Sequence, residues 1–147
     1  MKRAKRILVG LKTLDSADAL VDLACRLGAR GASLLLVHVL ELPGELAEPT
    51  VLNVDVPELD ATAAKIIGKG KRVARRNKMK ARALVLRARD AASTLLDLMK
   101  EEKIDLAVLG YRHRPALGEI LLGATAQHLA WKAPCHIVLS IPPREKA

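Results

Sequence analysis

The sequence predicts an α/β fold in which a parallel β-sheet carries helices on both faces, and three observations lead to that class. Five short apolar runs alternate along the chain with segments in which apolar residues recur at helical spacing. The runs are continuous, as expected for strands that are covered on both faces. The chain has 147 residues, half of them apolar, so we expect a single domain over residues 1–147 with a sizeable core.

The first strand is predicted at residues 6–11, where the run RILVGL ends at polar residues. The segment that follows repeats apolar residues at helical spacing. Asp15 or Ser16 is expected to cap this helix, because a short side-chain oxygen can accept a free N–H of the first turn. The second strand is predicted at residues 33–42. It contains one histidine, His38, which we expect to be packed or hydrogen-bonded inside the fold.

Residues 43–58 are predicted to form an acidic loop because they contain three prolines and a glycine. A helix with a strongly basic outer face is then predicted over residues 58–78. Gly68 and Gly70 weaken the expectation in the middle of this helix. The apolar face of the helix comprises Ala63, Ile66, Ile67, Gly70, Val73 and Ala74.

The remaining predicted elements are a strand at 81–86, a helix capped by Asp90, a strand at 104–110, a helix at about 120–132 and a strand at 134–141. Strands that alternate with helices imply right-handed crossovers and a parallel sheet. Ligands of such sheets bind beyond the carboxyl ends of the strands. The candidate site is therefore bounded by residues 10–15, 38–39, 87–90 and 110–125.

Charge is distributed unevenly along the chain, whose net charge is +9. Residues 41–64 carry six acids and no lysine or arginine, whereas residues 69–89 carry ten basic residues and no acid. This basic segment is either a solvated helix face or a contact for a polyanion. One tyrosine, one tryptophan and no phenylalanine leave few rings for stacking on single-stranded nucleic acid, so we do not expect a nucleic-acid partner.

The two cysteines, Cys25 and Cys135, are expected to be free buried thiols, because neither has the spacing of a metal site. No apolar run approaches the roughly 20 residues of a membrane span, so no transmembrane segment is predicted. The basic and then apolar start of the chain is too short in its apolar part for a signal peptide. We therefore expect a cytoplasmic protein.

Several segments together resemble the universal stress protein family. They are ILV before a polar loop, LLLVHVLE, and DLAVLGYR…LG…LLGATAQHL…APCHIVL, and the match runs nearly end to end. The resemblance implies a flavodoxin-like (Rossmann-like) three-layer sandwich with a five-stranded parallel sheet in the order 3-2-1-4-5. It also implies a role in stress response and a homodimer formed through the last strand, residues 135–141.

Many members of this family bind ATP through a loop that reads Gly, two residues, Gly, nine residues, Gly, then Ser or Thr. Placed on this chain, the four positions are Gly110, His113, Gly123 and Ala124, so two of the four depart from the pattern. Thr125 brings a hydroxyl one place late. The resemblance thus implies an atypical adenine-nucleotide pocket, with Mg²⁺ expected only if ATP is bound.

Other residues of the expected pocket follow from the same resemblance. Gly10 and Val39 are expected to line the adenine side, and Arg112 or Lys12 to supply positive charge. Lys12 stands where the family has an aspartate. The loop glycines also have a structural explanation, since glycine permits turns and close packing.

Two further functions stay open from the sequence. The chain can be an interaction protein without a pocket ligand that uses its dimer surface and a basic helix at 65–80 to contact a polyanion, a membrane transporter or a protein. Slow ATP hydrolysis is the third possibility. Catalysis is not expected, because the sequence shows no nucleophile paired with a base.

Overall fold

The computed structural model describes residues 2–41, 50–51, 57–110 and 124–142. Its strands are β1 (Ala4–Gly10), β2 (Gly28–Glu41), β3 (Thr50–Val51), β4 (Lys80–Ala88), β5 (Leu106–Gly110) and β6 (His136–Ser140). They form one sheet in the order β3-β4-β2-β1-β5-β6, in which all pairs are parallel except β3 with β4. The five parallel strands reproduce the predicted order 3-2-1-4-5, so the fold class is confirmed. The two-residue antiparallel strand β3 was not predicted.

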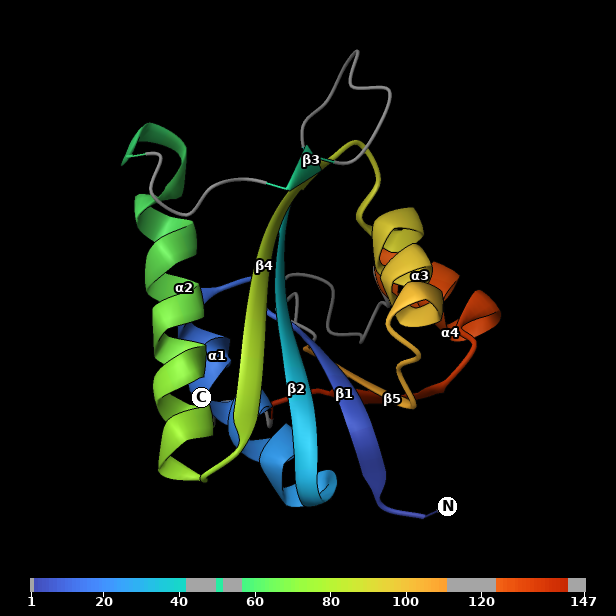
Figure 1. The fold of residues 1–147 in the computed structure, drawn as a ribbon. Helices are drawn as coiled ribbons and strands as arrows, with labels where there is room; N and C mark the ends of the chain where they lie inside the picture. Colours follow the sequence, from blue (N-terminus) through green and yellow to red (C-terminus); the bar gives the residue numbers. More distant parts are fainter. Residues whose placement is uncertain (1, 42–49, 52–56, 111–123, 143–147) are drawn as a thin grey trace, which may run out of the picture.

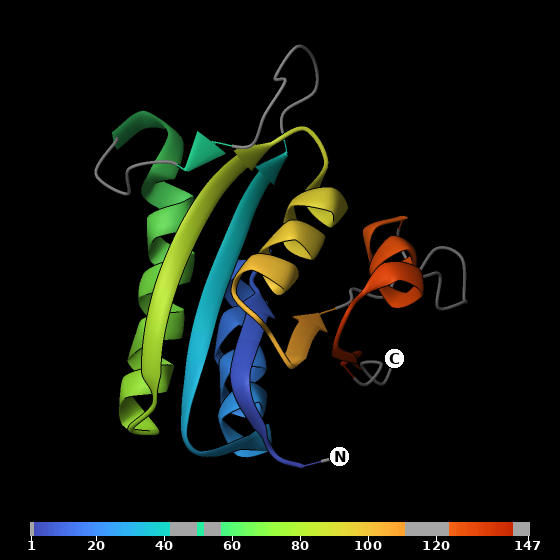
Figure 2. The same ribbon diagram turned by 45° about the vertical axis from the view of Figure 1, so that its right-hand side comes forward.

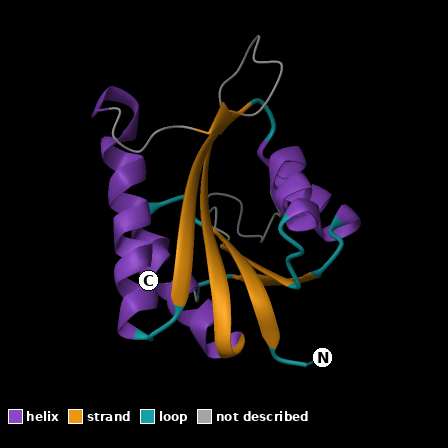
Figure 3. Cartoon of the chain, viewed as in Figure 1, coloured by secondary structure: helices purple, strands orange, loops and turns teal. Residues whose placement is uncertain are grey.

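Helices cover both faces of this sheet, as Figures 1 and 3 show. They are α1 (Leu14–Leu27), α2 (Pro57–Arg76), α3 (Ala91–Glu101) and α4 (Ala124–Lys132). Residues of α1 and α2 pack together in one apolar cluster, and residues of α3 and α4 pack in a second. The three layers expected from the sequence are therefore present.

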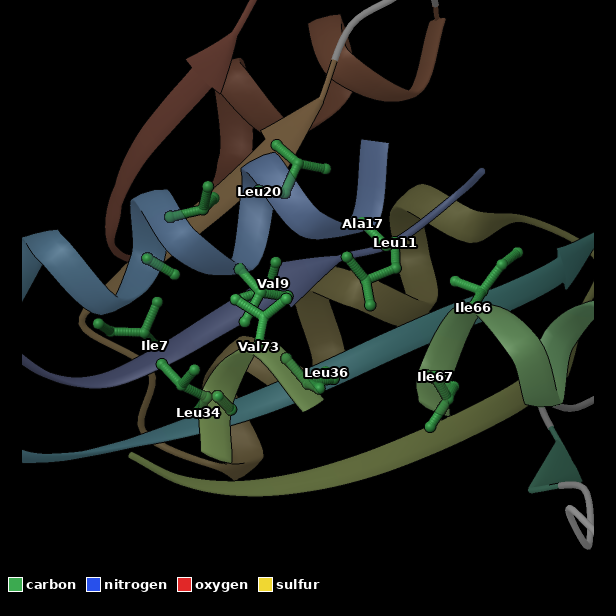
Figure 4. Close-up of a cluster of buried hydrophobic side chains, with 14 of the residues drawn as sticks. Ile7, Val9, Leu11, Ala17, Leu20, Leu34, Leu36, Ile66, Ile67 and Val73 are labelled. Atoms are coloured by element: carbon green, nitrogen blue, oxygen red, sulfur yellow. The ribbon is translucent and has the colours of Figure 1, made fainter. Parts of the chain in front are cut away.

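The core between the sheet and the pair α1 and α2 is aliphatic (Figure 4). Ile7 and Val9 of β1 point into it, and Leu36 of β2 lies beside them, each with no exposed surface. Leu20 of α1 and Ile66 of α2 close the layer. Burial of such side chains stabilises the fold by roughly 1.5–3 kcal/mol each.

The second core lies between the sheet and α3 and α4. Leu8 of β1 and Leu129 of α4 are fully buried in it, and Met99 of α3 is 1% exposed. Because Ile7 and Leu8 face opposite layers, β1 is covered on both sides. Burial on both faces therefore explains the continuous apolar run of β1, as predicted.

The start of α1 differs from the prediction. Thr13 is the N-cap residue, and it makes no side-chain capping hydrogen bond. The expectation that Asp15 or Ser16 caps the helix is therefore wrong. The hydroxyl groups of Thr13 and Ser16 lie 2.8 Å apart, and Ser16 Oγ donates to the Thr13 carbonyl oxygen at 3.3 Å. Both hydroxyls thus bond locally instead of accepting a backbone N–H.

The second strand starts five residues earlier than predicted, at Gly28. The extra length is possible because the pairing with β1 shifts between Ala4 and Arg6, which face Gly28 and Ser33. Gly31 lies within this shift with a φ of +82°, a value that favours glycine. A bulge of this kind leaves no mark in hydrophobic periodicity.

The long helix α2 is continuous through both of its central glycines. Its predicted apolar face is confirmed, since all six residues of that face are buried. Gly70 has a packing reason: a Cβ there would lie 3.0 Å from Leu11 Cδ1 and 3.1 Å from Leu36 Cδ1. The basic segment 65–80 was expected to be helical throughout, but the helix ends at Arg76. The last residues of this segment form a turn and the start of β4.

Candidate functional site

The strand order reverses direction at β1, which has β2 on one side and β5 on the other. Gly10, the last residue of β1, pairs with Val37 and with Leu109, so these three strands reach the same rim of the sheet. In an open parallel sheet a crevice forms at such a reversal, beyond the carboxyl ends of the strands. Figure 2 shows β1 and β5 leading to this region from neighbouring positions in the sheet.

A buried histidine fixes the chain where it leaves β1. Leu11 N–H donates to the Val37 carbonyl at 2.8 Å, which extends the contact with β2 by one residue. His38 is 6% exposed, and its Nδ1–H donates to the Leu11 carbonyl at 2.7 Å. The structural role predicted for His38 is confirmed. The next residue, Lys12, is exposed and begins the loop into α1.

The N-terminus of α1 is open at this rim. Its N-cap Thr13 makes no side-chain hydrogen bond to the first turn, so within the described part of the chain the N-cap side chain leaves the N–H groups there uncapped. These groups carry partial positive charge and lie directly after the exposed Lys12. An open helix N-terminus beside a lysine is a suitable environment for an anion.

The N-terminus of α3 differs, because Asp90 closes it. Asp90 Oδ1 accepts the Ala92 N–H at 3.0 Å, and Oδ2 accepts the Ser93 hydroxyl at 2.8 Å. The Ser93 hydrogen bond, helped by backbone hydrogen bonds and by the charge of His128, lowers the pKa of Asp90. The predicted capping role of Asp90 is confirmed.

The structure describes only part of the predicted pocket. Gly10 and Val39 belong to strands that end at the rim, and Val39 is half-buried beside the core of α3 and α4. Ala124 and Thr125 begin α4. Arg112, His113 and Gly123 lie outside the described residues.

Two of the predicted glycines have packing reasons of their own. A Cβ on Gly10 would lie 2.8 Å from Leu109 Cδ2, and a Cβ on Gly110 would lie 3.0 Å from Leu20 Cδ1. Both positions therefore favour glycine, because a side chain there would displace a packed leucine whether or not a ligand binds. The glycines alone do not identify a phosphate site.

The cysteines are free but only half-buried, which corrects the expectation of buried thiols. Desolvation is the main cause that raises the pKa of both thiols, with smaller contributions from Asp22 at Cys25 and Asp105 at Cys135. Both are therefore weak nucleophiles at neutral pH. Among the described residues, no three His, Cys, Asp or Glu side chains gather as metal ligands, and no helix is long and apolar enough to cross a membrane.

Sequence reasoning missed a polar notch at the opposite rim. A cavity of about 250 Å³ there is lined by Arg6, Ser33, Arg82 and Glu102, among others. Arg82 donates to Glu102 Oε2 at 2.6 Å, and Arg6 donates to the Glu102 carbonyl at 3.3 Å. Arg6, Ser33 and Arg82 lie on strands and face the α3 side of the sheet. Each precedes by two residues a leucine that packs in the α3 and α4 core, namely Leu8, Leu35 and Leu84. This alternation in the strands is the signal that could have located the notch.

Comparison with known proteins agrees with the fold and with the sequence resemblance. The model of the universal stress protein family matches residues 3–140. A relative from Thermus aquaticus, described as "Universal stress protein in QAH/OAS sulfhydrylase 3'region", is 32% identical over 137 residues, which are 92% of this chain and 97% of the relative.

Solved structures show the same architecture. A universal stress protein in complex with cAMP is 19% identical with a TM-score of 0.67, and the match covers 95% of this chain and 98% of that one. A universal stress protein family protein from Arabidopsis thaliana with AMP bound is 10% identical with a TM-score of 0.62, covering 95% and 92%. Through the family match and the relative from Thermus aquaticus, the chain belongs to the universal stress protein family.

Proposed function

We propose that this protein is a regulatory module of a stress response that binds an adenine nucleotide at the rim where β1 and β5 end. The observation that carries the proposal is the uncapped N-terminus of α1 beside Lys12, at the point where the strand order reverses. Free N–H groups and a lysine together favour a phosphate. Two fold neighbours hold cAMP or AMP, which supports an adenine nucleotide as the ligand class.

The proposed pocket is atypical because its charge is inverted at one position. Lys12 stands where the sequence resemblance expects an aspartate, so the rim attracts phosphate oxygens more strongly than a carboxylate would allow. Gly10 and Val39 would line the adenine side, and Gly110 and Thr125 would flank the phosphates. Arg112, His113, Gly123 and Ala124 complete the proposed site from the sequence. ATP would require Mg²⁺ to offset its charge, whereas AMP and cAMP would not.

Titration calorimetry with AMP, cAMP, ADP and ATP, with and without Mg²⁺, tests this proposal. The Lys12→Glu variant should bind the preferred nucleotide roughly tenfold more weakly or worse, because it loses a charged contact to phosphate. Lys71→Glu is the matched control, since Lys71 is also exposed but lies on α2. If no adenine nucleotide produces heat, or if both variants weaken binding equally, the proposed site is wrong.

We also propose that the protein forms a homodimer through β6. This strand pairs only with β5 among the described strands, so its other edge is unpaired there. Its residues Ile137, Val138 and Leu139 are half-buried, and the following Ile141 is 36% exposed. Such an apolar edge strand favours pairing with a second copy.

Light scattering should give twice the monomer mass, and Ile141→Arg should shift the measured mass toward that of the monomer. A cytoplasmic location stays a prediction.

A further inference from the structure

A group of exposed cations gathers at the end of the molecule opposite the proposed nucleotide site. The chain starts there, α1 turns into β2 there, and α2 turns into β4 there, as Figures 1 and 2 both show. The cations on these three segments are Lys2, Arg3, Lys5, Arg30, Arg75, Arg76, Lys78 and Lys80, and all eight are exposed. We call this group the basic end.

The cations of the basic end are not neutralised within the described part of the chain. None of the eight forms an ion pair there. Two acids near this end pair with other cations: Asp22 with Arg26 at 3.0 Å, and Glu102 with Arg82. Asp105 accepts the backbone N–H groups of Lys5 and Arg6 through its two carboxylate oxygens. Beside it, Lys2, Arg3 and Lys5 line a shallow hollow of about 250 Å³ with His136.

One of these lysines occupies a strained backbone position. Lys78 has a φ of +56° at the end of α2, where Met79 N–H donates to the Ala74 carbonyl at 2.9 Å. This geometry closes a helix and usually requires glycine or asparagine. Lys103, with a φ of +52°, occupies the same position after α3. Lys78 therefore places a charge at a position where glycine would fit without strain.

The shape of the basic end favours a flat partner over a nucleic acid. Its cations come from three blunt turns spread over one end of the molecule instead of a row along a cleft. The described helices reach this end with their C-termini, so no backbone N–H group at a helix start is available there to position a single phosphate, and attraction to anions comes from the side chains alone. The three segments that form the basic end expose no large apolar side chain among the described residues; Trp131, which is exposed, lies in the last turn of α4.

We propose that the basic end docks end-on against a bilayer surface rich in anionic phospholipid head groups. The contact is electrostatic and peripheral, because long lysine and arginine side chains meet head-group phosphates without inserting an apolar group. It leaves the opposite rim, and therefore the proposed nucleotide site, facing away from the bilayer. The two sites act independently of each other, so docking does not require a bound nucleotide.

Co-sedimentation of the full chain with vesicles of phosphatidylglycerol and phosphatidylcholine tests the proposal. Binding should increase with the phosphatidylglycerol fraction and vanish on pure phosphatidylcholine. It should fall steeply between about 0.05 and 0.5 M salt, because the electrostatic screening length becomes shorter. Each basic residue near such a surface contributes roughly a fivefold gain in partitioning. The triple variant Arg30→Gln, Lys78→Gly and Lys80→Gln should therefore bind roughly a hundredfold more weakly.

The matched control is Lys65→Gln, Lys71→Gln and Arg72→Gln, which removes three exposed charges from earlier turns of α2. This variant should bind vesicles within a few-fold of the unmodified protein. An equal or larger loss would mean that the side of α2 is the contact surface, and the end-on proposal would be wrong. Tighter binding to a duplex DNA competitor than to vesicles would also overturn it.

The single variant Lys78→Gly distinguishes a loss of vesicle binding from a loss of folding. Because glycine relieves the left-handed strain, this variant should melt at a temperature roughly 3 °C higher while binding vesicles several-fold more weakly. A more stable protein that docks less well cannot be explained by unfolding. Unchanged vesicle binding in both this variant and the triple variant would refute the proposal.

Discussion

Asp90 shows how one side chain determines both a helix start and a pH response. Its carboxylate accepts the Ala92 N–H and the Ser93 hydroxyl, and Asp90→Ala would lose both contacts. We expect this variant to be less stable by about 1 kcal/mol at neutral pH, the usual contribution of such a cap. Chemical denaturation followed by circular dichroism measures the difference. Asp90→Asn is the control, since asparagine caps a helix about as well as aspartate.

Acidification should reduce the effect of Asp90→Ala. The pKa of Asp90 is lower in the folded protein than in the unfolded chain, mainly because of the Ser93 hydrogen bond. Its contribution is therefore fully present above the ordinary aspartate pKa of about 3.9 and is lost as the pH falls through the lowered folded value. The stability difference between the unmodified protein and Asp90→Ala should shrink below about pH 4. A difference that grows on acidification would contradict this account of the cap.

The two glycines in the middle of α2 form a matched pair at the scale of a single element. A Cβ on Gly68 would meet no atom within 4 Å, whereas one on Gly70 would press on Leu11 and Leu36. Gly68→Ala should stabilise the protein by about 1 kcal/mol, because alanine favours the helix. Gly70→Ala should be less stable than Gly68→Ala by at least about 1 kcal/mol, since overpacking offsets the helical gain. Equal thermal melting of the two variants would refute the packing role of Gly70.

Gly70 also connects the helix to the candidate site. Leu11, which would be displaced by a side chain at position 70, is the residue whose carbonyl accepts the His38 hydrogen bond. Lys12 follows it directly. The position of the loop after β1 thus depends on contacts from three elements, and a change inside α2 can reach the rim through Leu11.

Hydrophobic patterning predicted most elements because burial determines them. The strand β1 is buried on both faces, so its run of apolar residues is continuous, and the inward face of α2 repeats at helical spacing. The Thr13 cap was missed because Thr13, Asp15 and Ser16 are all short polar residues, and the choice among them depends on local hydrogen bonds. The strand β3 has only two residues, which is too short for any period to show. It pairs with Leu86 and Arg87 near the end of β4.

The candidate site was less predictable than the fold. The rim itself follows from strand order, which brings the ends of β1, β2 and β5 together. The open N-terminus of α1 could not be read from the sequence, because a threonine at that place usually caps the helix. A structural explanation was predicted for the loop glycine Gly110 but not for Gly10, and the contacts with Leu20 and Leu109 that explain the two glycines come from tertiary packing.

At the scale of the whole molecule, the basic end lies where the strands begin, and the proposed nucleotide site lies where they end. Parallel topology produces this separation, since each helix returns the chain from one rim to the other. The two rims can therefore bind different partners without competing for the same residues.

The proposed dimer gives the position of the basic end at one end of the strands a measurable consequence. If β6 pairs with β6 of a second copy about a twofold axis, the two strands run antiparallel. The basic ends of the two protomers then face opposite directions, and one dimer can contact two bilayers.

We expect the unmodified protein to cluster anionic vesicles, seen as a rise in turbidity that high salt reverses. Ile141→Arg, as a monomer, should bind the same vesicles without clustering them, because each molecule then has one basic end. Clustering by a protein that light scattering shows to be monomeric would rule out this dimer geometry as its cause.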